Sequence, residues 1–199
     1  MSDLRIKPTL RGDRVILRPF EPGDGELMLK ILADPELQKL TGSCTSDEEG
    51  AQALSHEETR RVSQWYETRN EQTDRLDLAI VDRATGQLVG EVVFNDWDEK
   101  ARCVNFRILI GAPGRNRGLG QEAIRLFVRY GFEALNLNRI QLEVFDFNPR
   151  ALAVYRKTGF VLEGTSREAF YFNGRPVDVH QMAILRREYR PEPECESKE

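Results

Sequence analysis

The segment Gly111–Ala123, with the sequence GAPGRNRGLGQEA, decides the fold. It follows the stretch Cys103–Ile110, which is typical of a strand, and it precedes apolar residues at helical spacing as far as Leu135. Glycines let the backbone approach a ligand closely, and the first N–H groups of a helix are unpaired and lie at its positive end. The segment therefore predicts a phosphate-binding loop at the start of a helix, with Arg115 and Arg117 adding positive charge at its rim.

Three other interpretations of this loop compete with a phosphate site. In the first, the glycines form a turn that only caps the helix, with both arginines solvated. A Walker loop is the second, but it requires a Lys before Ser or Thr, which the segment lacks. Third, Gly118-x-Gly120-x-x-Ala123 formally matches a dinucleotide fingerprint, with Glu143 on the next strand. Against that match, seven residues separate Ile110 from Gly118, and the preceding strands are predicted to be antiparallel.

The composition indicates one globular domain, or at most two small ones, with a charged, soluble surface. The chain has 199 residues, of which 40% are hydrophobic, and its 29 Lys+Arg against 33 Asp+Glu give a net charge of −4. This balance argues against a nucleic-acid-binding protein, and no apolar run approaches the roughly 20 residues of a membrane-spanning helix. The three cysteines lie far apart and there are two histidines, so we expect no metal site and a cytoplasmic location.

The rest of the chain predicts a mixture of helices and strands. Short loops between residues 76 and 110 predict antiparallel strands there, and Asn173-Gly174 is the strongest hairpin signal. Residues 189–199 are charged and contain prolines, so we expect a disordered tail. The predicted strands are 15–17, 76–81, 87–94, 103–110, 139–145, 160–172 and 175–185, and the predicted helices are 27–32, 57–70, 119–135 and 149–158.

Three motifs in order resemble the GNAT superfamily of acetyl-CoA-dependent N-acetyltransferases. Arg115-x-x-Gly118-x-Gly120 resembles the pyrophosphate loop of that family, and Asn148-x-x-Ala151-x-x-x-Tyr155-x-x-x-Gly159-Phe160 is similar to its second signature. The segments 15–20 and 170–182 are similar to the branch of ribosomal-protein and spermidine N-acetyltransferases. The resemblance covers about residues 10–188 and implies a single GNAT-like domain of the α/β class (α+β type). Its expected sheet is mixed and mostly antiparallel, with one splayed parallel strand pair.

The resemblance also implies the reaction and the coenzyme site. It implies direct transfer of an acetyl group from acetyl-CoA to a primary amine, such as a peptide N-terminus, a polyamine or another small amine. The backbone N–H groups of Arg117 to Gln121 would hold the pyrophosphate, and the strand end 108–110 would pair with the pantetheine arm and supply donors to the carbonyl oxygen. Asn148 either binds the pantetheine arm or caps the next helix, and both roles are compatible. The expected coenzyme-binding residues are Ile108, Leu109, Ile110, Arg115, Asn116, Arg117, Gly118, Leu119, Gly120, Gln121 and Asn148.

Tyr155 matches the general acid of the family. A phenol with a pKa of about 10 can protonate a thiolate whose conjugate acid has a pKa of about 8.5, because solvent returns the proton. The alternative is a core tyrosine with a satisfied hydroxyl. Cys103 precedes the loop without a nearby histidine, which disfavours a mechanism through an acylated cysteine.

The general base is where the sequence departs from the family. Many relatives have a Glu in the middle of the strand before the loop, and the aligned residue here is Asn105. An amide cannot accept a proton at neutral pH. Glu91 on the preceding strand and Asp96 are the candidate bases, or water takes the proton. The departure keeps open a non-catalytic sensor or interaction module that binds coenzyme A.

The acceptor side of the family corresponds here to the first helix and residues 42–72. An acidic wall there would suit a cationic amine, although a solvated helix face explains the same residues equally well. Trp65-Tyr66 is either an aromatic wall or a core anchor. The resemblance leaves open a homodimer formed through the last hairpin. The acidic residues concerned are Asp47, Glu48, Glu49, Glu57, Glu58 and Glu67.

Overall fold

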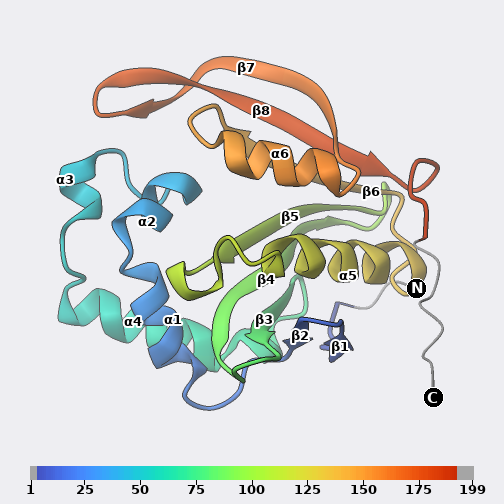
Figure 1. Ribbon diagram of the computed structural model, residues 1–199, viewed down its shortest axis with the longest axis horizontal. Helices are drawn as coiled ribbons and strands as arrows, with labels where there is room; N and C mark the ends of the chain where they lie inside the picture. The colour runs from blue at the N-terminus through green and yellow to red at the C-terminus, as the bar shows by residue number, and fades with distance from the viewer. Residues whose placement is uncertain (1–3, 192–199) are drawn as a thin grey trace.

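The computed structural model describes residues 4–191, which form one mixed sheet with helices on both faces (Figure 1). The strands are β1 (Leu10–Arg11), β2 (Val15–Arg18), β3 (Leu76–Asp82), β4 (Leu88–Asp98), β5 (Cys103–Ile110), β6 (Arg139–Phe145), β7 (Val161–Phe172) and β8 (Arg175–Leu185). The helices are α1 (Asp24–Leu32), α2 (Pro35–Thr41), α3 (Asp47–Gly50), α4 (His56–Glu67), α5 (Leu119–Glu133) and α6 (Pro149–Lys157), with short 3₁₀ turns η1 (Arg69–Glu71) and η2 (Ala112–Gly114).

The eight strands lie in the order β1-β2-β3-β4-β5-β6-β8-β7. Every neighbouring pair is antiparallel except β5 and β6, which run parallel. The expected mixed, mostly antiparallel sheet is therefore confirmed. The predicted strand 103–110 coincides with β5, whereas β4 extends to Asp98, beyond the predicted end at residue 94.

The parallel pair separates along its length. Pairing of β5 with β6 is limited to Cys103↔Arg139, Val104↔Ile140 and Asn105↔Gln141. Beyond these residues β5 continues against β4 and β6 continues against β8. From Phe106 onward, the edge of β5 that faces β6 therefore has no partner strand in the described part of the chain, as expected for a splayed pair.

The helix α2 was not predicted, because Asp34-Pro35 was interpreted only as the end of α1. The Asp34 carboxylate accepts a hydrogen bond from the Glu36 N–H group at 3.0 Å, and Pro35 occupies the first turn of α2. Asp and Pro are favoured at these two positions of a helix start. The same two residues thus end one helix and begin the next.

Two apolar clusters hold helices against opposite faces of the sheet. On one face, the ring of Phe127 from α5 stacks on Phe94 with centroids 3.9 Å apart, and Phe106 lies beside both. On the other face, Tyr66 of α4 packs on Phe20 with centroids 5.1 Å apart. Tyr66 is therefore the core anchor of the Trp65-Tyr66 pair. The gap between β5 and β6 connects these two faces.

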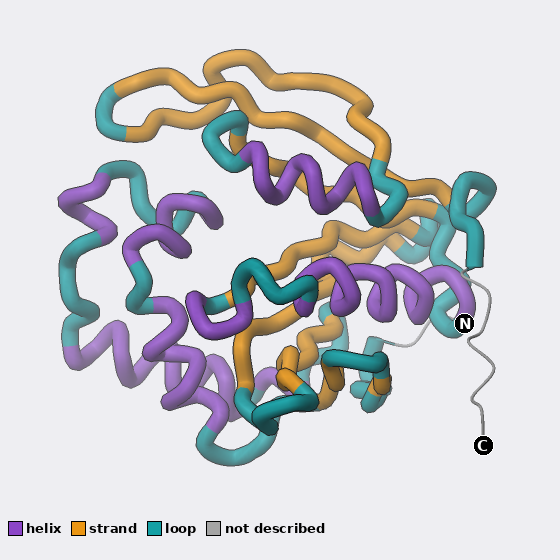
Figure 2. Tube along the Cα trace, in the orientation of Figure 1, coloured by secondary structure: helices purple, strands orange, loops and turns teal. Residues whose placement is uncertain are grey.

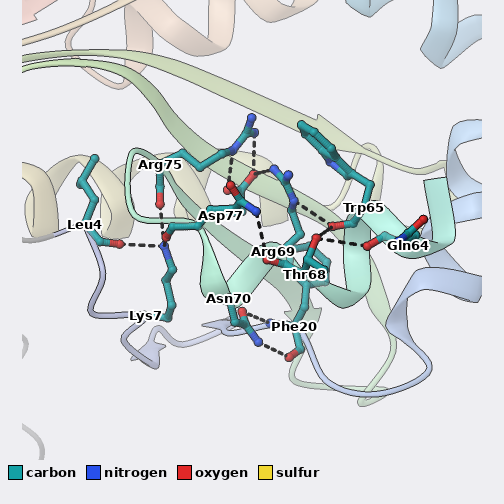
Figure 3. Close-up of polar contacts among 11 residues, drawn as sticks. Leu4, Lys7, Phe20, Gln64, Trp65, Thr68, Arg69, Asn70, Arg75 and Asp77 are labelled. Atoms are coloured by element: carbon teal, nitrogen blue, oxygen red, sulfur yellow. Dashed lines mark hydrogen bonds and ion pairs between the residues drawn. The ribbon is translucent and has the colours of Figure 1, made fainter. Parts of the chain in front are cut away.

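A polar cluster joins the N-terminal segment to the start of β3 (Figure 3). Arg75 binds the carboxylate of Asp77 through two hydrogen bonds, of 2.8 and 2.7 Å, and the buried Arg69 lies 3.5 Å from the same carboxylate. The ammonium of Lys7 donates to the carbonyl oxygens of Leu4, Gln72 and Arg75. These contacts fix the backbone from which Arg75 projects.

We expect Lys7→Met to lower the free energy of unfolding by about 1–3 kcal/mol, because three carbonyl groups lose their shared donor. Urea denaturation of the variant measures this loss. Lys30→Met, in the last turn of α1, is the control, because Lys30 has no such set of carbonyl partners among the described residues. Equal stability of the Lys7 variant and the wild type would contradict the structural role.

The two ends of the β7–β8 hairpin contact other parts of the chain. At its tip, Asn173 exchanges side-chain hydrogen bonds with Asp47, the first residue of α3, and its N–H group donates to the carbonyl oxygen of Thr45. Figure 1 shows α3 beneath the hairpin. After β8, the ring of Tyr189 stacks on Phe132 with centroids 5.0 Å apart, so this residue of the expected tail packs on α5. The remainder of that tail, residues 192–199, lies outside the described residues. Within residues 4–191, no helix is long and apolar enough to cross a membrane.

Candidate active site

A cavity of about 620 Å³ occupies the gap between β5 and β6. In Figures 1 and 2 the start of α5 and the helix α6 flank this gap on one face of the sheet. Of the residues expected to act, those that line the cavity are Glu91, Ile108, Leu109, Ile110, Arg115, Asn116, Gly118, Gly120, Gln121, Asn148 and Tyr155. Arg117 and Leu119 do not line it, and the Leu119 side chain lies in the core.

The start of α5 offers unpaired N–H groups to the cavity. Gly118 adopts φ 78°, a left-handed conformation that favours glycine, and no side chain within residues 4–191 caps the helix. The first backbone hydrogen bond of the helix runs from Glu122 to Gly118 at 3.2 Å. Among the described residues, the N–H groups of Arg117 to Gln121 have no acceptor. A helix start of this kind suits a pyrophosphate.

Both arginines expected to add positive charge at the loop rim form ion pairs within the chain. Arg115 is paired with Asp34 at 2.7 Å and with Glu36 at 2.5 Å, and its Nε donates to the carbonyl oxygen of Ile110 at 3.0 Å. Arg117 is paired with Asp82 at 2.8 Å. Both side chains therefore hold the loop against α2 and β3. What the loop offers to phosphate is mainly its backbone.

Asn148 and the free edge of β5 fit a pantetheine arm. The side-chain oxygen of Asn148 accepts a hydrogen bond from the Ala151 N–H group at 3.1 Å, so Asn148 caps α6. Asn148 lines the cavity, and its side-chain nitrogen makes no hydrogen bond with the described residues, which leaves a donor for a ligand. The unpaired edge of β5 beyond Asn105 supplies backbone donors and acceptors beside it.

Tyr155 lies in α6 and borders the same cavity. Its ring packs edge-on against Phe106 with centroids 6.4 Å apart and contacts Phe160, which fixes its position. Within the described residues its hydroxyl makes no hydrogen bond. Burial raises the pKa of Tyr155 to about 12, while the positive charge of Arg107 opposes the shift. The phenol is therefore protonated at neutral pH.

Glu91 reaches the cavity from β4 on the other face of the sheet. Its neighbour on β5 is Leu109, at the splayed end of that strand. Burial, followed by the charge of Asp77, raises the pKa of Glu91 to about 7. The hydrogen bond from Tyr66 and the positive charges of Arg107 and Arg75 lower this pKa and so oppose part of the shift. A carboxylate with this pKa can exchange protons at neutral pH.

Of the two candidate bases, Glu91 lines the cavity and Asp96 does not. Asp96 is exposed at the far end of β4 and does not line the cavity. Asn105 donates to the side-chain oxygen of Asn95 at 3.0 Å, so the amide at the family's Glu position pairs across β4 and β5. Burial raises the pKa of the Cys103 thiol, which makes it a poor nucleophile. Glu91 is thus the expected base that lies in the cavity.

The acidic residues of the segment 42–72 do not line the cavity. Glu49 accepts hydrogen bonds from Thr45, and Glu58 completes a capping box with Ser55. The carboxylates of Glu49 and Glu58 serve local helix starts, which favours the solvated helix face over the acidic wall as the explanation of this segment. Trp65, which is 49% exposed, does line the cavity and stacks on Arg69. Sequence reasoning missed the cavity-lining Arg75 and Arg107.

Comparison with known proteins agrees with this geometry. Residues 14–161 match the family described as Acetyltransferase (GNAT) domain. The chain belongs to the GNAT acetyltransferase family. This acetyltransferase is 30% identical over 185 residues to the uncharacterized N-acetyltransferase p20 of Bacillus licheniformis, covering 91% of this chain and 98% of that one. It is 32% identical over 141 residues to the spermidine N(1)-acetyltransferase of Vibrio cholerae, covering 64% and 82% of the two chains.

A solved structure supports the same assignment. The spermidine N-acetyltransferase from Vibrio cholerae, in complex with CoA and spermine, matches with a TM-score of 0.77 and 25% identity. That match covers 89% of this chain and 99% of the other. This acetyltransferase therefore takes its acetyl group from acetyl-CoA and transfers it to an amine, and nothing in these comparisons supports a non-catalytic module.

Proposed function

We propose that the protein moves the acetyl group directly to a primary amine, with Glu91 as general base and Tyr155 as general acid. Acetyl-CoA supplies the acetyl group as a thioester. The amine nitrogen bonds to the carbonyl carbon and the C–S bond breaks, so the nitrogen loses a proton and the sulfur gains one. Glu91 accepts the first proton and Tyr155 donates the second. Solvent then restores both groups.

One observation carries this proposal. Glu91 and Tyr155 lie on opposite faces of the sheet and line the same cavity at the gap between β5 and β6. A base with a pKa of about 7 and an acid with a pKa of about 12 have the protonation states that the two transfers require at neutral pH. In this proposal the N–H groups at the start of α5 bind the pyrophosphate, and the Asn148 amide and the β5 edge bind the pantetheine arm.

The relatives support an amine acceptor without deciding its kind. Some are named for spermidine, and one from Bacillus subtilis is named a putative ribosomal N-acetyltransferase. We propose a primary amine on a small molecule or a peptide N-terminus. We place the reaction in the cytoplasm, which is consistent with the free thiols of Cys44 and Cys103. We also propose that the protein has no nucleic-acid or membrane partner, and that any homodimer forms through the β7–β8 hairpin.

Release of free thiol from acetyl-CoA in the presence of an amine panel tests the activity. Spermidine, peptides with different N-termini, amino acids and aminoglycosides form the panel. Release that depends on the amine, with the acetylated product identified by mass spectrometry, supports the proposal. Tight binding of coenzyme A without any acetylated product would contradict it.

We expect Tyr155→Phe to lower kcat by about 10²-fold, because the sulfur then leaves without a positioned proton donor. The ring still packs on Phe106 and Phe160, so coenzyme affinity is expected to stay near that of the wild type. Single-turnover rates and calorimetric titration of coenzyme A measure the two quantities. The control is Tyr171→Phe, which removes a hydroxyl from an exposed position of β7. An unchanged single-turnover rate would remove Tyr155 from this role.

A further inference from the structure

We infer that the acceptor is a small amine that also bears a carboxylate, as an amino acid does, and that Arg107 recognises this carboxylate. The inference rests on the proposed function, because it assigns the substrate class of the same site.

Strand register places Arg107 beside Glu91. In the antiparallel pair of β4 and β5, Glu91 lies opposite Leu109 and Val93 lies opposite Arg107. Opposed residues point to the same face of a sheet, and alternate residues of one strand share that face. Glu91 and Arg107 therefore project from one face at neighbouring positions. Tyr155 packs on Phe106, which points to the other face.

The charges of Asp77, Arg69 and Arg75 near Glu91 are already paired with one another, whereas Arg107 has no partner at ion-pair distance among the described residues. Asp77 is held by the two hydrogen bonds of Arg75 and by the ion pair with Arg69, as Figure 3 shows. Arg107 is exposed in the cavity, and it forms no ion pair or hydrogen bond with the described residues. The amine-receiving face thus has a guanidinium without a partner next to the proposed base. A guanidinium binds a carboxylate through two parallel hydrogen bonds.

The guanidinium of Arg107 disfavours a second ammonium beside it. Arg107 lines the cavity on the face of Glu91 and has no ion-pair partner among the described residues, so an ammonium placed next to it would be repelled, whereas the charge of Arg75 is offset by Asp77. Glu143 of β6 also lines the cavity and is exposed there. An acceptor with one amine and one carboxylate can pair its carboxylate with Arg107 and present its nitrogen to Glu91. A spermidine-like acceptor offers Arg107 no carboxylate.

Matched acceptors test the inference with the full-length protein. A mixture of the protein amino acids is compared with the corresponding amino acid amides and with spermidine, by thiol release and mass spectrometry of the products. An amide lacks the carboxylate and its amine is less basic, so more of the amide is in the reactive neutral form. A preference for the acids of tenfold or more in kcat/KM is the expected result. Turnover of spermidine or the amides that equals or exceeds that of the acids would overturn the inference and leave acetyl transfer intact.

The variant Arg107→Met assigns the preference to one residue. Loss of a charge-assisted pair costs about 1.5–3 kcal/mol, so we expect the ratio of kcat/KM for acid over amide to fall by about 10- to 10²-fold. The ratio is the correct readout, because Arg107 also shifts the pKa values of Glu91 and Tyr155 and so affects every acceptor. Arg107→Lys should restore part of the ratio, and Arg167→Met on the exposed β7 is the control. An unchanged ratio in Arg107→Met would refute the role of Arg107. Absence of acetylation with every acceptor would instead count against the proposed function.

Discussion

Glu91→Gln is expected to lower kcat/KM by about 10²- to 10³-fold at pH 7.5, since the amide cannot accept the proton of the amine. Gln has the size of Glu and can still accept the hydrogen bond of Tyr66, so the variant tests proton transfer rather than packing. The effect should lie in the chemical step, with coenzyme affinity close to that of the wild type. Pre-steady-state acetyl transfer to a fixed amine measures it.

The pH dependence of the wild type adds a second expectation for Glu91. Because burial raises the pKa of this carboxyl to about 7, kcat/KM should rise with pH through a limb near 7, and the limb should be absent from Glu91→Gln. An ordinary Glu would ionise near pH 4.3 and give no limb there. A wild-type profile that is flat between pH 6 and 8, apart from the ionisation of the amine itself, would argue that water rather than Glu91 carries the proton.

The raised pKa of Glu91 also makes the stability of the folded protein depend on pH. The folded-state pKa of Glu91 lies above its unfolded value, so the unfolded chain releases the proton at lower pH than the folded chain does. The contribution of Glu91 to stability is therefore complete below about pH 4.3 and is lost as pH rises through 7. Wild type should lose stability relative to Glu91→Gln across this interval, and urea denaturation at several pH values tests the sign.

The sequence could predict those parts of the site whose structure is determined by residues close together in the chain. The loop before α5 has a glycine at the position that needs positive φ, and Asn148-Pro149 defines the start of α6 within two residues. Glu91 was a candidate because β4 precedes the glycine-loop strand and must pair with it. The splay of β5 from β6 came from the family resemblance, because no local pattern determines where two strands part.

What sequence could not predict is the partner of each charge. Arg115 is paired with Asp34, which lies 81 residues earlier, and no periodicity encodes a contact of that separation. Glu49 and Glu58 satisfy helix-start donors within four residues, so a run of acidic residues in the sequence did not become an acidic cavity. Arg107 was not singled out, because an arginine on a strand is most often a solvated residue. The available signal was its place two residues after Asn105, on the strand that borders the loop.

Gly120→Trp is expected to weaken coenzyme A binding by at least about 10²-fold, because the indole would occupy the space beside the unpaired N–H groups at the start of α5. A side chain at this position begins in the cavity: an added Cβ would lie 3.3 Å from Cγ1 and 3.8 Å from Cδ1 of Ile110. Displacing a phosphate from two such donors removes charge-assisted hydrogen bonds worth about 1.5–3 kcal/mol each, which converts to this loss. Titration calorimetry with coenzyme A measures it.

The choice of Gly120 over Gly118 keeps the result interpretable. Gly118 has φ 78°, so any side chain there strains the backbone, and an added Cβ would lie 2.9 Å from the guanidinium of Arg14. Gly120 is helical and accepts a side chain without that strain. Gly164→Trp on β7 is the matched control, since a Cβ there meets nothing closer than the Gln181 side chain at 3.7 Å and lies outside the cavity. If Gly120→Trp and Gly164→Trp had the same thermal stability and the same affinity for coenzyme A, the helix start could not be the pyrophosphate site. A selective loss of affinity in Gly120→Trp would place the coenzyme there independently of any catalytic assay.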